Sequence, residues 1–159
     1  MHCGQSPDDT HSIWLNQLVQ FVQAHLRSSL NLIADLSKLP TKDLVDNSLF
    51  ISLDVVNLYP SVPIKSAIEV VSNFTNTHWS KIDNMGISID QFIKMLNFVS
   101  YNYEIQFNGK VFLQVKGCPM GSHYAPPFAI IFMNFIEEKA LNILENRFNL
   151  KITDLIYKR

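Results

Sequence analysis

The feature that most constrains this chain is a pair of β-prone runs separated by two residues. In the stretch YEIQFNGKVFLQV, aromatic and β-branched residues flank the dipeptide Asn108-Gly109. Asn-Gly is the favoured pair for a two-residue type I′ turn, because both turn positions need a positive φ. The pattern therefore predicts a β-hairpin, and any fold proposed for the chain must contain this antiparallel strand pair.

A glycine-containing turn, KGCPMGS, and a long apolar segment follow the hairpin directly. We expect a helix over residues 125–146, with Pro126 and Pro127 confined to its first turn. The apolar part of this helix is too short to cross a bilayer, so no membrane segment is predicted.

Helical spacing of apolar residues accounts for much of the remaining chain. Residues 12–30 show this spacing and follow several candidate N-cap residues. Ser88 and Gln91 form a capping-box pattern, which predicts a helix that reaches about residue 100. We expect two shorter helices, one that ends at Pro40 and one over residues 64–74.

Residues 49–56, LFISLDVV, predict a strand buried on both faces, because nearly all of its residues are apolar. Pro60 and Pro63 end this strand, and the tail KITDLIYKR has the composition of a further strand start. Together these elements predict an α+β fold in which helices pack on a small, mainly antiparallel sheet.

Composition limits the classes of function. The chain has 159 residues, 47% of them hydrophobic and 17% charged, which indicates one folded domain. Its formal net charge of −1 lacks the basic surplus typical of nucleic-acid binders. Cys3 and Cys118 are too few for a disulfide framework or a zinc site, and no signal peptide is visible. We expect an intracellular protein, in either nucleus or cytoplasm.

Asp54 is the candidate metal ligand of the predicted strand. A carboxylate at the end of a buried strand can hold Mg²⁺, a hard cation that prefers oxygen ligands. The alternative is an ordinary turn acid that accepts backbone N–H bonds. Tyr59, five residues later, has a plain alternative of its own as a core or turn aromatic.

Gly117 and Gly121 mark the second candidate segment, between the hairpin and the long helix. Glycine lets the backbone approach a ligand closely, and free N–H groups at a helix start favour anionic groups. The alternative is a connection that only needs glycine torsions. The sequence contains no GxGxxG, P-loop or G-x-S-x-G pattern, which argues against dinucleotide, NTPase and serine-hydrolase sites.

Taken in order, the two segments resemble motifs A and B of the reverse transcriptase family, most closely its Penelope-like retroelement branch. FISLDVVNLYPSVP resembles motif A, with an acid after an apolar strand and an aromatic five residues later. QVKGCPMGSHYAPP resembles motif B, with Q-x-x-G-x-P-M-G-S followed by A-P. The resemblance implies a single partial domain, with residues 1–48 as a helical lead-in and residues 49–159 as a segment of a polymerase palm.

The resemblance also implies a reaction, namely DNA synthesis on an RNA template by two-metal nucleotidyl transfer. Its partners would be an RNA template, a DNA primer and a dNTP, and its cofactor Mg²⁺. Asp54 would bind the metal ions with help from the backbone carbonyl of Val55. Tyr59 would exclude a ribose 2′-hydroxyl by its volume.

In motif B, Met120 and Gly121 match positions near the incoming nucleotide and the template base. Many related polymerases have Gln where this chain has Met120, but Met is usual in the Penelope-like branch. It replaces a hydrogen-bonding amide with a soft apolar contact. Gly117, together with Pro119 and Ser122, would shape the loop of this substrate site.

Motif C, which carries a second pair of acids as Y-x-D-D, does not occur in the sequence. Its one Asp-Asp pair, Asp8-Asp9, precedes the first predicted helix, and helix capping explains it. The resemblance therefore implies one carboxylate of three, weak Mg²⁺ binding, negligible activity of this chain alone and an open sheet edge.

Two other hypotheses stay open. The chain could be a non-catalytic nucleic-acid-binding or interaction domain derived from a reverse transcriptase. It could also be an unrelated α+β interaction domain, in which Asp54 and Gly121 share no cleft.

Overall fold

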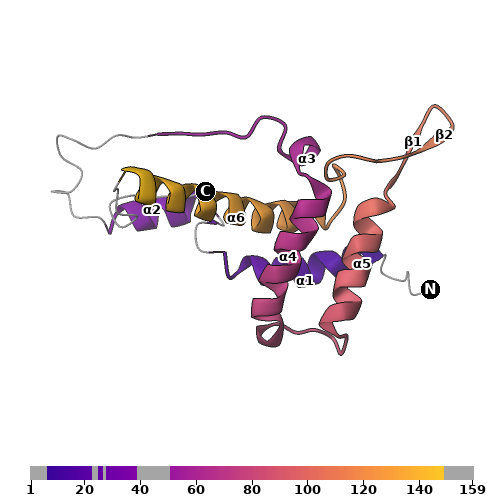
Figure 1. Cartoon of the computed structure of the whole chain (residues 1–159), viewed down its shortest axis with the longest axis horizontal. Helices are drawn as coiled ribbons and strands as arrows, with labels where there is room; N and C mark the ends of the chain where they lie inside the picture. The colour runs from indigo at the N-terminus through magenta and orange to yellow at the C-terminus, as the bar shows by residue number, and fades with distance from the viewer. Residues whose placement is uncertain (1–6, 23–24, 27, 39–50, 149–159) are drawn as a thin grey trace.

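The computed structural model describes residues 7–22, 25–26, 28–38 and 51–148 (Figure 1). In chain order its elements are α1 (Pro7–Val19), α2 (Ser29–Leu36), α3 (Leu58–Ser61), α4 (Ile64–His78), the 3-10 turn η2 (Trp79–Lys81), α5 (Ile89–Tyr101), β1 (Glu104–Phe107), β2 (Lys110–Leu113) and α6 (Ala125–Phe148). The described residues thus combine helices with one two-stranded sheet. This confirms the predicted α+β class in its general form.

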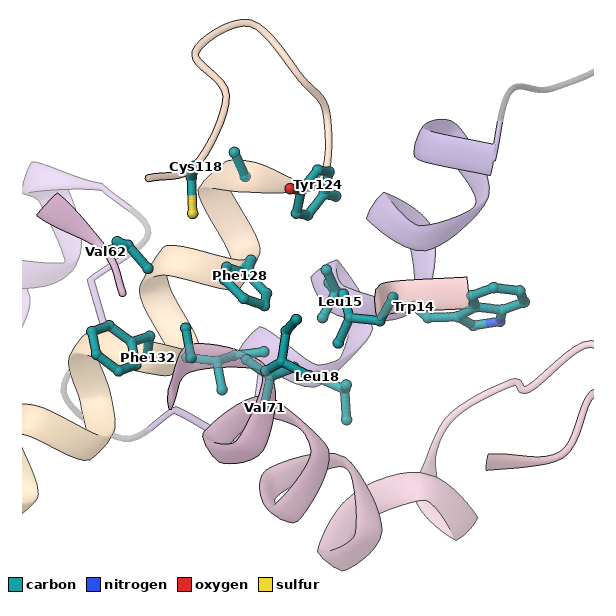
Figure 2. Close-up of a cluster of buried hydrophobic side chains, with 14 of the residues drawn as sticks. Trp14, Leu15, Leu18, Val62, Val71, Cys118, Tyr124, Phe128 and Phe132 are labelled. Carbon is teal, nitrogen blue, oxygen red and sulfur yellow. The ribbon is translucent and has the colours of Figure 1, made fainter. Parts of the chain in front are cut away.

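The core lies among helices α1, α4, α5 and the first part of α6, which pack against one another. Figure 2 shows apolar side chains from these elements converging, with Leu15 and Leu18 of α1 close to Val71 of α4 and Phe128 of α6. The sequence predicted helices packed on a sheet. Instead, every residue of β1 and β2 is exposed, because the helices already bury each other's apolar faces.

Three predicted helix starts are confirmed. α5 begins with a complete capping box, in which the Ser88 hydroxyl accepts from the Gln91 N–H and the Gln91 side chain accepts from the Ser88 N–H. α4 begins directly after Pro63, and α6 begins at Ala125. Within the described ranges, none of the helices has the length and apolar character that crossing a membrane requires.

The first helix begins and ends earlier than the predicted range of 12–30. Because α1 starts at Pro7, Asp8 and Asp9 lie in its first turn and not before it. After α1, the N–H groups of Phe21 and Val22 donate to carbonyl oxygens three residues earlier, so the chain turns. The Phe21 ring then stacks on the ring of His78, with centroids 4.5 Å apart. A contact with α4 thus overrides the local helical pattern.

The second helix, α2, begins after Ser28, whose hydroxyl accepts a bond from the Asn31 N–H. Pro40, the predicted end signal for this helix, lies outside the described residues, as does the tail predicted to start a strand.

The strand predicted over residues 49–56 is wrong in the part that the structure describes. Residues 51–56 form no strand, and their side chains are exposed, with Leu53 87% exposed. Residues 49 and 50 lie outside the described residues. An apolar run shows that a segment can be buried, but a strand also needs a neighbour to pair with. Among the described residues, no strand pairs with residues 51–56.

The hairpin is confirmed in register and turn type. Phe107 pairs with Lys110 across the turn, and Asn108 and Gly109 have φ values of 48° and 71°, as a type I′ turn requires. The hairpin projects from the helices near α5 (Figure 1).

Candidate functional site

The two motif segments meet in the structure through a backbone hydrogen bond. The N–H of Cys118 donates to the carbonyl oxygen of Tyr59 at 2.8 Å, and the N–H of Val62 donates to the same oxygen at 3.4 Å. The short helix α3 of the first segment is thereby joined to the loop of the second. We call this contact the motif junction.

Gly117 makes the motif junction possible. Its φ is +73°, and a side-chain carbon on it would lie 2.6 Å from the Cα of Pro60 and 2.7 Å from the carbonyl oxygen of Tyr59. Only glycine combines this torsion with so close an approach. From the sequence, we expected this glycine to let the backbone approach a ligand. In the structure, it instead lets the backbone of Tyr59 and Pro60 approach Gly117 closely.

Gln114, which follows β2 directly, holds the loop through hydrogen bonds to loop carbonyl groups. Its Nε2 donates to the carbonyl oxygens of Lys116 and Gly117, each at 3.0 Å, and its backbone N–H donates to the carbonyl of Tyr103 at 2.9 Å. Sequence reasoning gave this residue no role. Its spacing of three residues before Gly117 was the available signal, because a glutamine at that distance can reach the loop carbonyls.

The inside of the loop is buried. Burial raises the pKa of the Cys118 thiol to about 12, so this group stays protonated and unreactive at neutral pH. The Ser122 hydroxyl, also buried, donates to the carbonyl of Pro119 at 3.2 Å. The bond between Ser122 and Pro119 agrees with the loop-shaping role expected for these two residues.

A cleft of about 390 Å³ opens beside the motif junction. Pro60 lines it from α3, Met120 and Cys118 from the loop, and Tyr103 to Gln106 from the start of the hairpin. None of its lining residues is Lys or Arg, and one is an acid, Glu104. The volume lies within the range of small-molecule sites. A lining without a basic side chain favours an uncharged group over a phosphate.

Asp54 and Val55 do not line this cleft. Both are exposed on the 51–56 segment, which runs away from α3 on the side opposite the hairpin (Figure 1). Nowhere in the described ranges do three His, Cys, Asp or Glu side chains gather closely enough to hold a metal ion.

The other predicted site residues lie close to the motif junction. Tyr59 is half-buried and packs against the helical core, while Met120 is 73% exposed at the rim of the cleft. Gly121 is exposed, with φ +94° and open space around it. The structure therefore brings together Tyr59, Gly117 and Met120, and it leaves Asp54 and Val55 apart from them.

Searches with this chain against protein-family models, curated proteins and solved structures returned no match. A functional assignment therefore depends on the two motifs and on the geometry of their junction.

Proposed function

We propose that this chain carries the motif A and motif B segments of a reverse transcriptase of the Penelope-like type. The motif junction is the observation that carries the proposal. Two stretches that resemble parts of one active site contact each other through the Tyr59 carbonyl and the Cys118 N–H, at 2.8 Å. The contact also needs the motif glycine, Gly117, so the resemblance and the packing depend on the same residue.

In this proposal, Asp54 supplies one carboxylate ligand for Mg²⁺, and the carbonyl of Val55 supplies a second oxygen. The bound ions would stabilise the charge that develops on the transferring phosphoryl group. The sequence has no Y-x-D-D, so the remaining carboxylates would come from another polypeptide segment. Tyr59 as a gate against ribose remains part of the proposal, although Tyr59 packs against the core and its neighbour Pro60, not Tyr59 itself, lines the cleft.

The cleft beside the motif junction would receive the base and sugar side of the substrate. Pro60 and Met120 offer apolar contact surface, and the lack of basic residues disfavours the triphosphate. The partners proposed for the site are an RNA template, a DNA primer and a dNTP.

Replacing Met120 by alanine should weaken binding of an RNA–DNA primer–template. The Met120 side chain is 73% exposed and contributes little to folding, so its apolar surface matters only in a complex. Losing an apolar contact worth about 1 kcal/mol predicts roughly fivefold weaker binding. Fluorescence anisotropy with a labelled primer–template at low salt measures the change.

Met85→Ala is the matched control, because Met85 is also exposed, at 52%, but lies in the turn before α5 and away from the cleft. It should bind like the unmodified chain. Equal weakening by both substitutions, or no binding by the unmodified chain, would contradict a substrate role for the cleft.

A non-catalytic domain derived from a reverse transcriptase is the second candidate. Its support is that Asp54 does not line the cleft. The same observation is what the unrelated α+β interaction domain predicts, since Asp54 and Gly121 then share no cleft. If the chain is the non-catalytic domain, primer–template binding should be unaffected by Mg²⁺ and by Asp54→Ala.

A further inference from the structure

Residues 51–56 are an extended segment whose backbone lacks partners in the described part of the chain. All of its side chains are exposed. Once the segment pairs as a strand, Ile51 and Leu53 would lie on one face and Ser52 and Asp54 on the other. No backbone hydrogen bond joins this segment to another described residue. Unpaired N–H and C=O groups along an apolar, β-prone segment favour pairing with a strand edge.

The hairpin offers such an edge along β2. The bond from the Gln114 N–H to the Tyr103 carbonyl marks a hydrogen-bonded pair, and such pairs alternate along an antiparallel ladder. Val111 and Leu113 therefore direct their N–H and C=O groups away from β1. Every residue of β2 is exposed, and among the described residues only β1 pairs with β2, so its other edge has no described partner.

The segment and the edge of β2 lie apart within one chain. In Figure 1 the 51–56 segment leaves α3 on one side, and the hairpin projects on the other. The motif junction, through Tyr59 and Cys118, fixes the base of the segment. In this structure the segment does not pair with β2 of its own chain, so the partner considered for it is the β2 edge of a second copy.

We propose that residues 51–56 of one copy of this chain pair as an antiparallel strand with β2 of a second copy. By two-fold symmetry, residues 51–56 of the second copy pair with β2 of the first, so the dimer contains two equivalent ladders. This inference does not depend on the proposed function, and it competes with it at one residue, because an Asp54 paired with Lys110 of the second copy is not free to hold Mg²⁺.

The charges fix the register. If Asp54 lies opposite Lys110, then Leu53 lies opposite Val111 and Ile51 opposite Leu113. This register pairs the acid with a base and apolar residues with apolar residues, as stable cross-strand pairs require. It also places Leu53 and Ile51 opposite the outward-facing backbone groups of β2, so their N–H and C=O groups can complete the ladder.

Charge reversal tests the register. Asp54→Lys and Lys110→Asp should each weaken the dimer by roughly tenfold or more, because each replaces two attractive cross-strand pairs per dimer by repulsive ones. The double variant, Asp54→Lys with Lys110→Asp, should restore dimerisation. Analytical ultracentrifugation of the full chain over a range of concentrations measures the dissociation constant. Both residues are exposed, and circular dichroism checks that each variant stays folded.

Cysteine pairs test the contact independently. In a Cys3→Ser background, Leu53→Cys with Val111→Cys should form a disulfide between two chains, since Cα atoms in such a pair lie about 5.5 Å apart. The buried thiol of Cys118 should not interfere. The control, Leu53→Cys with Phe112→Cys, directs the two thiols to opposite faces and should cross-link far less.

Five results would overturn the proposal, of which four concern the dimer and its cross-links. These four are a monomer at every concentration, a dimer that charge reversal leaves unchanged, a disulfide within a single chain, and equal cross-linking by both cysteine pairs. Open-ended aggregates in place of a discrete dimer would also contradict the two-fold contact, since a closed pair leaves neither segment free.

Discussion

Replacing Gly117 by alanine is expected to lower the free energy of unfolding by about 3 kcal/mol or more. The left-handed torsion costs an L-residue roughly 1–2 kcal/mol, and the new carbon, 2.6 Å from the Cα of Pro60, adds the strain of overpacking. Relief of the clash moves Pro60 away from the loop, which weakens the bond between Tyr59 and Cys118. Urea unfolding followed by far-UV circular dichroism measures the loss.

Gly86→Ala separates the two causes. Gly86 has a similar torsion, φ +77°, but a side-chain carbon at this position would meet no atom within 4 Å. This variant should lose only about 1 kcal/mol, the torsional part. Equal losses at Gly117 and Gly86 would contradict a close contact at the motif junction.

Phe92→Ala should destabilise the chain by about 3–5 kcal/mol, the usual range for removing a buried aromatic. Phe92 is fully buried on α5, and its ring lies 5.2 Å from that of Trp79 and 5.9 Å from that of Trp14. The cavity would open where α1 and α5 meet, so the neighbouring rings would lose contacts as well. The free energy of unfolding in urea reports the effect.

Phe98→Ala is the matched control on the same helix. Phe98 is 63% exposed, so its removal should change stability by less than about 0.5 kcal/mol. If the two substitutions lowered the free energy of unfolding equally, the packing of the helical core around Phe92 described above would be wrong.

Elements with complete local signals could be predicted from the sequence. The capping box of Ser88 and Gln91 sets the start of α5, and Asn108-Gly109 sets the hairpin turn. In each case residues a few positions apart determine the geometry, so no knowledge of the rest of the chain is needed.

Elements that depend on distant contacts could not be predicted. The end of α1 depends on the stacking of Phe21 against His78, which belongs to α4. The 51–56 segment has the composition of a buried strand, but composition does not supply the neighbouring strand. The wrong predictions at both places share this cause.

The candidate site was predictable only in outline. The order of the motifs indicated that the segments around Asp54 and Gly117 belong together, and the motif junction is consistent with this. The hydrogen bond from Gln114 to the Gly117 carbonyl and the close approach of Gly117 to Pro60 are features of the folded chain that motif spacing alone does not reveal. The separation of Asp54 from the cleft likewise follows from the path of the unpaired segment.

A primer-extension assay tests most directly whether Asp54 is one carboxylate of three, with the other two absent from this sequence. The chain and its Asp54→Ala variant are each given a DNA primer on an RNA template, dNTPs, and either Mg²⁺ or Mn²⁺. We predict no extension by either protein with either metal ion, although both should bind the primer–template. Extension by the unmodified chain that Asp54→Ala abolishes would contradict this prediction, because it would mean that the 159 residues contain a complete catalytic site.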